Sequence, residues 1–338
     1  MATLETQQLD EIIVKTRRKM LTMGGAALAA LAFGGTTKAE AQSTTTPDQD
    51  ILNFALNLEY LEAQFYNLAV SGVTIDQLPT PIPVAVNGGT AGSVTLKPSF
   101  AKVPFVSSIV AAYAAETATE EGKHVLFLQK TLGSVAVSMP DIDLFNSFNA
   151  LANLAGIGTS FDPFASDQNF LIGAYIFEDV GVSAYHGAAP LIADKTGVLP
   201  AALGLHAVEA YHAGLIRTVI SAYDNGVSTG PLSTMTQAIS AARSTLANPD
   251  PTMPITSPFT TFAGTTADDL GVQSATVSLN GGSTSATFTS TTIADTDLNA
   301  LGWSRNSIQI LAIVTGNPAT ATAFTGGFFP NGLNGTIS

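Results

Sequence analysis

Glutamate and histidine residues recur inside the most apolar helical stretches of this chain, where an unpaired charge is expensive to bury. The clearest case is the segment VEAYHAGL, in which Glu209 precedes His212 by three positions. The same spacing joins Glu121 to His124 in a second stretch. Residues three apart lie on one face of a helix, so each pair points in a single direction. Two of only four histidines are therefore paired with a glutamate at helical spacing.

Apolar side chains recur every three to four residues along four long stretches, which predicts four long helices. Pro47 and Asp48 make a good start for the first, and Asn225-Gly226 makes a good stop for the last. Four long helices joined by loops favour a mainly α protein, built as an antiparallel four-helix bundle with a short fifth helix. The predicted helices cover about residues 48–70, 103–132, 166–192, 200–224 and, for the fifth, 231–246.

Two regions of different composition interrupt or follow the predicted bundle. An insertion at about residues 70–104 is rich in Pro and Gly, which predicts a long loop or a small hairpin. After Pro249 the chain is rich in Thr, Ser, Ala and Gly, and alternation around Asn280-Gly281 predicts a β-hairpin. We therefore expect a bundle at residues 48–248 and a C-terminal extension at residues 249–338 that packs on it.

The N-terminus has the three parts of an export signal. A twin arginine occupies residues 17–18, a mildly apolar run residues 21–33, and an A-x-A cleavage site residues 39–41. The apolar run is 13 residues long, against the roughly 20 that a membrane span needs. Residues 1–41 are therefore expected to be a twin-arginine-type signal peptide. This predicts a periplasmic or extracellular mature chain without a stable transmembrane segment.

Composition excludes one class of partner. Charged residues make up only 12% of the chain, and the net charge is −13. A nucleic-acid-binding surface needs clustered Lys and Arg, so nucleic acid is excluded as a partner. The chain contains no cysteine, so its stability must come from packing, metal binding or assembly into an oligomer.

The first and third predicted helices carry a second repeated spacing. Glu59 is followed seven residues later by Tyr66, and Glu178 by Tyr185, which places each pair two turns apart on one helix face. The order along the chain is therefore Glu…Tyr, ExxH, Glu…Tyr, ExxH. This order is an internal repeat of a helical hairpin.

Burial of so many acidic groups needs compensating charge. Each inward carboxylate left alone in the bundle would cost on the order of several kcal/mol. Two divalent metal ions would supply four positive charges against four carboxylates, while His124 and His212 would add neutral nitrogen donors and leave coordination positions open. Hard carboxylates with one imidazole per metal suit iron or manganese. The sequence therefore predicts a dinuclear metal site inside the bundle.

Four phrases of the sequence resemble a known superfamily: LNFALNLEYLEAQFY, EEGKHVLFLQKTLG, FEDVGVSAYHGAAP and, near the C-terminus, GGFFPNGLNG. They are similar to ferritin-like proteins, and more narrowly to the ferritin-like domain proteins related to plant desiccation-related proteins. The resemblance covers roughly residues 48–245, and the last phrase extends it nearly to the C-terminus. It implies a ferritin-like bundle in which two helices each give one glutamate, and the other two each give an ExxH pair, to a di-iron or di-manganese site.

The resemblance also implies a set of metal ligands. Glu59 takes the first-helix position because its spacing from Tyr66 matches other members, whereas Glu62 shares the face and could replace Glu59 or bridge the metals. Tyr66 and Tyr185 could hydrogen-bond ligand carboxylates, transfer electrons or simply pack, and they are the accessory catalytic candidates. The other implied ligands are Glu121, His124, Glu178, Glu209 and His212.

The remaining acidic and histidine residues of the helices have other expected roles. Glu116 is expected on a solvated helix face, and Glu120 either shares that face or orients a ligand histidine. His186 and His206 lack a glutamate at the same spacing and are expected to be hydrogen-bonded core or rim residues. Val208 stands where relatives often have an acidic residue, which puts equal binding of the two metals in question.

A carboxylate-bridged pair of redox metals can exchange two electrons, which suits peroxide dismutation, ferrous oxidation or O₂ chemistry with small oxidants. The alternative is a non-catalytic desiccation or stress protein whose metals only stabilise the bundle. An iron-storage shell is less favoured, because the insertion at 70–104 and the extension would have to lie outside the shell. Nothing in the spacing favours an acid/base hydrolase.

Overall fold

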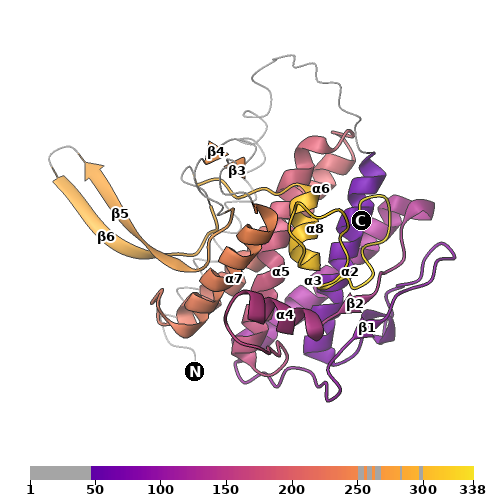
Figure 1. The fold of residues 1–338 in the computed structure, drawn as a ribbon, viewed down its shortest axis with the longest axis horizontal. Coiled ribbons are helices and arrows are strands. Elements are labelled where there is room, and N and C mark those ends of the chain that lie inside the picture. The colour runs from indigo at the N-terminus through magenta and orange to yellow at the C-terminus, as the bar shows by residue number, and fades with distance from the viewer. Residues whose placement is uncertain (1–46, 250–254, 257–260, 263–267, 282–283, 297–299) are drawn as a thin grey trace, which may run out of the picture. The chain divides into compact units, whose positions relative to one another are not determined.

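The computed structural model describes residues 47–249, 255–256, 261–262, 268–281, 284–296 and 300–338. The predicted signal peptide, residues 1–41, lies outside the described residues. Helices dominate the described part of the chain, which confirms the predicted mainly α fold (Figure 1). The helices are α2 (Asp48–Ser71), α3 (Ser108–Leu132), α4 (Asn146–Leu154), α5 (Asp167–Ala188), α6 (Val198–Tyr223), α7 (Pro231–Ala247) and α8 (Ser307–Thr315). The strands are β1 (Val94–Thr95), β2 (Ile142–Asp143), β3 (Ile255–Thr256), β4 (Thr261–Phe262), β5 (Gln273–Gly281) and β6 (Thr284–Thr292).

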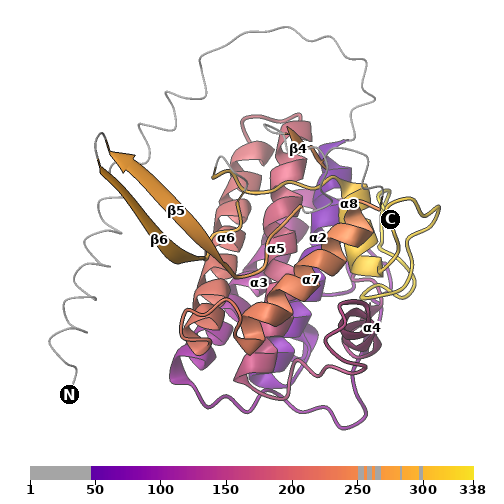
Figure 2. The same cartoon turned by 60° about the vertical axis from the view of Figure 1, so that its left-hand side comes forward.

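Four long helices form an antiparallel bundle. α2 packs along α3 and α5 packs along α6, while α2 also contacts α5 and α3 also contacts α6 (Figures 1 and 2). Two contacts fix the directions of α2 and α5. Tyr66 reaches Glu178, and Tyr185 reaches Glu59, so the two helices run in opposite directions. Every bundle helix can therefore present its middle to the same interior region.

The second helix of the bundle begins later than the sequence predicted. α3 starts at Ser108 rather than near Val103. Pro104 disfavours helical backbone at Val103, the residue before it. The Ser107 side chain then caps the helix by accepting the backbone N–H of Val110.

The insertion after α2 does not form a self-contained hairpin. Its short strand β1 pairs in parallel with β2, which follows α3, and Val94 lies opposite Ile142. A parallel partner has to come from a more distant part of the chain, so the hairpin alternative is wrong. The insertion is instead attached to the segment between α3 and α4.

A cluster of phenylalanines joins the bundle to its connections and to the C-terminal tail. Phe65 of α2 packs on Phe164 and on Phe177 of α5, with ring centroids 5.5 Å and 5.1 Å apart. Phe328 of the tail packs on Phe148 of α4 at 5.2 Å and on Phe177 at 4.9 Å. The Gly- and Phe-rich tail is therefore part of the core rather than a solvated extension.

The hairpin predicted in the C-terminal extension is present as the antiparallel pair of β5 and β6. Pairing runs from Gln273 opposite Thr292 to Gly281 opposite Thr284. The prediction of a turn at Asn280-Gly281 is wrong, because both residues belong to β5. The alternating sequence pattern continues along both strands, so the strands still pair at Asn280 and Gly281, the dipeptide that predicted a turn.

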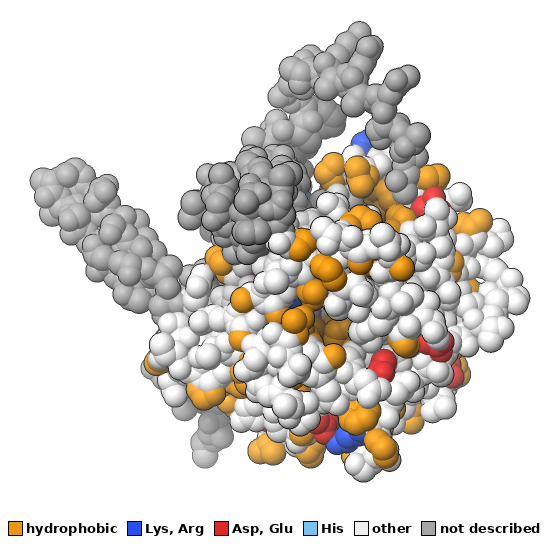
Figure 3. All heavy atoms as spheres, in the orientation of Figure 1, with side chains coloured by type: hydrophobic (Ala, Val, Ile, Leu, Met, Phe, Trp, Pro, Cys, Tyr) orange, Lys and Arg blue, Asp and Glu red, His pale blue; other side chains and the backbone are white. Residues whose placement is uncertain are grey.

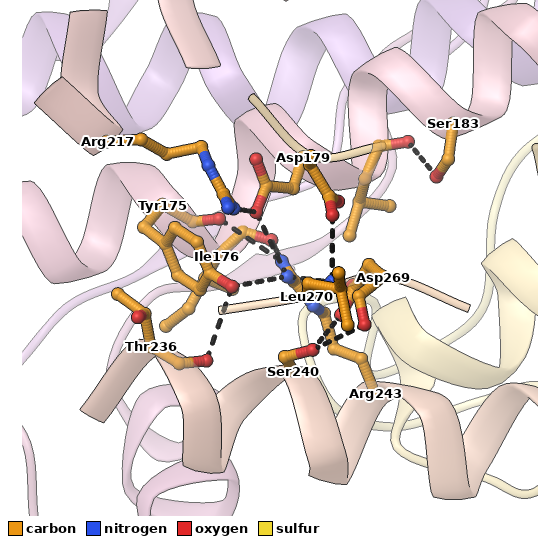
Figure 4. A network of polar contacts seen from close by, with 12 residues as sticks. Tyr175, Ile176, Asp179, Ser183, Arg217, Thr236, Ser240, Arg243, Asp269 and Leu270 are labelled. Atoms are coloured by element: carbon orange, nitrogen blue, oxygen red, sulfur yellow. Dashed lines mark hydrogen bonds and ion pairs between the residues drawn. The ribbon is translucent and has the colours of Figure 1, made fainter. Parts of the chain in front are cut away.

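A network of buried charges ties α5, α6 and α7 to the C-terminal extension (Figure 4). Arg243 of α7 lies 3.2 Å from an oxygen of Asp179 in α5 and 2.8 Å from an oxygen of Asp269 in the extension. Arg217 of α6 also reaches Asp179, at 2.9 Å, and Arg305 reaches Asp269 at 2.8 Å. All three arginines are buried, so Asp179 and Asp269 replace the water that would otherwise surround the guanidinium charges. Sequence reasoning missed this network because no spacing connects its members.

The surface carries few charges on the face drawn in Figure 3, where hydrophobic side chains lie among uncharged polar atoms. This agrees with the charged fraction of the sequence, 12%. None of the helices in the described ranges has the length and apolar character that a bilayer crossing needs.

Replacing Arg305 with methionine should strongly destabilise the protein. The substitution leaves Asp268 and Asp269 buried with less positive charge, and breaking a buried ion pair typically costs about 3–5 kcal/mol. Denaturant unfolding should show this loss. Lys195→Met, at an exposed lysine, should change the free energy of unfolding by less than about 0.5 kcal/mol. Equal stability of the two variants would contradict a stabilising role for the network.

Candidate metal centre

All four bundle helices contribute to one buried cluster of carboxylates and imidazoles. The ligand atoms of six residues form two overlapping groups, and within each group all atoms lie within 4.8 Å of one another. The first group is Glu59, Glu121, His124 and Glu209, and the second is Glu121, Glu178, Glu209 and His212. Because Glu121 and Glu209 belong to both groups, they could bridge two cations.

Both histidines turn their Nδ1 atoms toward the carboxylates. In His124, Nδ1 lies 3.1 Å from an oxygen of Glu59 and 3.3 Å from an oxygen of Glu121. In His212, Nδ1 lies 3.0 Å from an oxygen of Glu121 and 3.4 Å from an oxygen of Glu178. The two imidazole centroids are 6.3 Å apart. Glu121 is therefore within reach of both imidazoles.

Many polar atoms of the cluster lack a hydrogen-bond partner among the described residues. Both carboxylate oxygens of Glu121 and of Glu209 lack one, as do one oxygen of Glu178 and Nδ1 of His212. The short distances from Nδ1 of His212 to Glu121 and Glu178 therefore do not correspond to well-formed hydrogen bonds. Buried polar atoms without partners are rare, and converging carboxylates and imidazoles are the donors that iron or manganese accepts. The residues present thus fit a dinuclear metal site.

Burial and mutual repulsion perturb the acidity of these groups. Burial raises the pKa of Glu59 to about 7, against the opposing effect of His124. Burial and the surrounding carboxylates also raise the pKa of Glu209 well above its ordinary value. Burial alone would lower the pKa of the two histidines, but the neighbouring carboxylates outweigh it and raise the pKa of His124 to about 11 and that of His212 to about 12. Without cations the cluster would hold protons, which binding cations would displace.

Two tyrosines link the helices in a reciprocal pattern. The hydroxyl of Tyr66 in α2 donates to Glu178 in α5, and the hydroxyl of Tyr185 in α5 donates to Glu59 in α2. Burial, together with nearby carboxylates, raises the pKa of both tyrosines well above the ordinary value, so both remain donors. The repeated Glu…Tyr spacing of the sequence thus becomes a symmetric pair of hydrogen bonds that orient two carboxylates.

The two halves of the cluster differ behind their histidines. Nε2 of His212 lies 2.8 Å from the carboxylate of Glu120, which leaves Nδ1 of that ring facing the cluster. In the other half the residue that corresponds to Glu120 is Val208, whose side chain has no polar atom. Glu116 is exposed, as expected. A carboxylate behind an imidazole fixes its tautomer and raises its basicity, so the two histidines are not equivalent.

Glu62 is buried beside the cluster but belongs to neither group. It is 5% exposed, and its Oε2 has no hydrogen-bond partner among the described residues. A Cβ atom added at Gly181 of α5 would lie 2.5 Å from an oxygen of Glu209 and 3.5 Å from an oxygen of Glu62, so both carboxylates approach this glycine. The geometry therefore brings Glu59, rather than Glu62, into the groups.

Gly181 is a site residue that sequence reasoning missed. It lies three residues after Glu178, on the same face of α5, and any side chain there would collide with Glu209. The signal that could have found it is its position inside a helix, where glycine costs about 1 kcal/mol relative to alanine. This signal is not specific, because Gly204 and Gly214 also lie inside a bundle helix, α6, and have open space where a Cβ atom would be.

The other two histidines lie outside both groups. Nδ1 of His186 donates to the carbonyl oxygen of Trp303 at 3.0 Å, and the ring of His206 lies 5.8 Å from that of His186. Burial, followed by the neighbouring His186, lowers the pKa of His206. Both histidines are half-buried, as expected for rim residues.

A four-helix bundle in which two helices give one glutamate and two give an ExxH pair is the pattern of the ferritin-like proteins. The comparison with known families agrees with it, since the ferritin-like domain family matches residues 47–222. The chain belongs to this family, and the relationship inferred from the sequence is confirmed.

Two curated relatives are similar to the chain over different extents. The desiccation-related protein PCC13-62 of Craterostigma plantagineum is 31% identical over 175 residues, which are 51% of this chain and 53% of the relative. The ferritin-like catalase Nec2 of Nesocodon mauritianus is 26% identical over 304 residues, which are 86% of this chain and 85% of the relative. The chain thus spans about half the length of the first relative and most of the second. No solved structure gives a significant match.

Replacing Glu120 with alanine should weaken the binding of one metal ion and leave the other unchanged. Loss of the carboxylate behind a ligand histidine typically lowers metal affinity about 10–100-fold. Titration of the metal-free protein with Mn²⁺, followed by calorimetry and electron paramagnetic resonance, should resolve one weakened and one unchanged site. Glu116→Ala removes an exposed acidic group from the same helix and should change neither. Equal effects at both sites would contradict the asymmetry.

Proposed function

We propose that this protein is a redox enzyme that holds two iron or manganese ions in the cluster and uses them to dispose of hydrogen peroxide. The observation that carries the proposal is the overlap of the two ligand groups, because shared carboxylates hold two metals close enough to act together. The bridging ligands would be Glu121 and Glu209. The other ligands would be Glu59 and His124 at one metal, and Glu178 and His212 at the other.

A bridged pair of redox metals supplies two electrons at one place, which suits the disproportionation of hydrogen peroxide. One peroxide is oxidised to O₂ and gives up two electrons and two protons, and a second peroxide takes up both and becomes two waters. The protein's own part is to hold the ligands in place. Tyr185 and Tyr66 would orient Glu59 and Glu178, and Glu120 would orient His212.

The names of the relatives support a protective redox role. The relative named a ferritin-like catalase aligns with 86% of this chain, so the alignment continues past the bundle into part of the C-terminal extension. The relative named a desiccation-related protein aligns with 51% of the chain, and its name specifies no reaction. Removal of peroxide is a form of stress protection, so the two names do not conflict.

We also propose that the protein is exported by a twin-arginine signal, as the residues at 17–18, 21–33 and 39–41 suggest. This route carries folded proteins, so the metals could be loaded before export. Replacing both Arg17 and Arg18 with lysine should keep the unprocessed chain inside the cell. Cell fractionation and a mass measurement of the mature protein check this, and normal processing of the variant would contradict it.

Glu121→Ala should abolish binding of both metals, because Glu121 belongs to both groups, and peroxide turnover should be lost with them. Metal analysis by mass spectrometry and oxygen evolution from hydrogen peroxide measure the two effects, with Glu116→Ala as the control. Retention of two metals by Glu121→Ala would refute the ligand assignment. A parent protein that binds two metals but evolves no oxygen would refute the enzyme and favour a structural role for the metals.

Removing the metals should lower the melting temperature of the protein. Cations that bind only the folded state stabilise it, by about 2.7 kcal/mol at a free concentration one hundred times the Kd. Calorimetric scans with and without a chelator measure this difference. The melting temperature of Glu121→Ala should not respond to the chelator, and an equal response in both proteins would show that the stabilising cation binds elsewhere.

A further inference from the structure

A small apolar pocket lies between α2, α5 and the start of α6. Its walls include Phe54 and Ala55 of α2, Ala184 and Ala188 of α5, and Ala202 of α6. The cavity has a volume of about 30 Å³, which is enough for one or two molecules of the size of water. Ala55 and Ala188 are half-buried, whereas the other three are buried, so these two alanines lie nearest the solvent.

Three polar side chains also line this pocket, namely Glu59, Glu62 and Tyr185. Glu59 and Tyr185 are hydrogen-bonded to each other and belong to the cluster, so the pocket reaches the candidate metal centre. Glu62 is different, because its buried Oε2 has no hydrogen-bond partner among the described residues. A buried carboxyl oxygen without a partner indicates that a polar ligand binds in the adjoining cavity.

The opposite side of Glu62 faces the C-terminal extension. A second cavity, of about 20 Å³, is lined there by Ile313 and Val314 of α8 and by Phe328 of the tail, all of them buried. Among the described residues that line this cavity, Glu62 has the only polar side chain. Within the part of the chain that the structure describes, no member of the two ligand groups lines this second cavity, whereas Glu59 lines the first. A polar ligand shared by Glu62 and the metal pair would therefore arrive from the side of Ala55 and Ala188.

We propose that the apolar pocket is the path by which hydrogen peroxide reaches the metal pair, and that Glu62 hydrogen-bonds the peroxide next to the metals. This inference rests on the proposed function and specifies its substrate and its access route. The walls favour an uncharged molecule, because a ferrous ion would lose its hydration among the aliphatic side chains that make up most of the lining. The small volume excludes bulky organic peroxides.

Filling the mouth of the pocket should slow access without changing the metal content. Ala55→Phe and Ala188→Phe each place a ring at the mouth, and Ala207→Phe is a matched control at an exposed position of α6. We expect kcat/KM for hydrogen peroxide to fall about tenfold or more in both pocket variants and to be unchanged in the control. If a phenylalanine variant does not fold, the corresponding leucine variant tests the same path with a smaller side chain.

Nitric oxide provides a measurement that needs no turnover. Its association rate with the reduced protein, loaded with ferrous iron, should fall by about the same factor in the pocket variants. Unchanged nitric oxide rates and unchanged kcat/KM at full metal content would overturn the path. A parent that consumes no peroxide, but whose nitric oxide rate still depends on the pocket, would refute the proposed function and leave the path intact.

Substitutions of Glu62 test whether this residue binds peroxide or is instead a metal ligand. Glu62→Leu should retain two metals and a parental nitric oxide rate, while KM for peroxide rises about tenfold, as expected for one lost hydrogen bond. Glu62→Gln keeps a polar side chain of the same size and should restore most of the lost affinity. Loss of a metal from both variants would show that Glu62 is a metal ligand and would overturn the proposed contact with peroxide. An unchanged KM in Glu62→Leu would also overturn that contact.

Discussion

Mutual repulsion among buried carboxylates is the constraint on which this structure depends. Four helices each aim a glutamate at one interior region, and a single uncompensated buried charge costs several kcal/mol. In the absence of cations the compensation would come from protons, since the pKa of Glu59 and of both histidines is raised. Cations would replace those protons with charge that is fixed in place. Binding of cations to the cluster would therefore be linked to the integrity of the bundle.

The internal repeat makes the two halves of the bundle nearly equivalent. The positions at which the two halves carry different residues lie at the candidate site. Glu59 corresponds to Glu178, so Glu62, three residues after Glu59, corresponds to Gly181. An additional acid in one half thus faces a glycine in the other, and only a residue without a side chain leaves room for Glu62 and Glu209 together. A second difference of this kind is that the acidic Glu120 of one half corresponds to the apolar Val208 of the other. The repeat builds the candidate metal centre, and its exceptions distinguish one side of that centre from the other.

The periodic parts of the molecule could be predicted from the sequence, because a spacing of three or four residues determines which side chains share a helix face. The bundle and the convergence of Glu121, His124 and their counterparts follow from that spacing. Periodicity could not separate Glu59 from Glu62, which share one face, and only the packing of α5 against α2 distinguishes them. The parallel pairing of β1 with β2 and the buried arginine network depend on contacts between distant segments, which no local pattern encodes.

The C-terminal extension differs from the bundle in composition but encloses the same site. Phe328 lines the cavity on the far side of Glu62. Asp269 pairs with Arg243, which also contacts Asp179, the residue next to Glu178. The described chain accordingly forms one compact unit rather than a bundle with a separate module. Without the extension, buried arginines would lose acidic partners and the apolar cavity behind Glu62 would open to water. The apolar surroundings of the candidate metal centre therefore depend on segments that contribute no residue to its two groups.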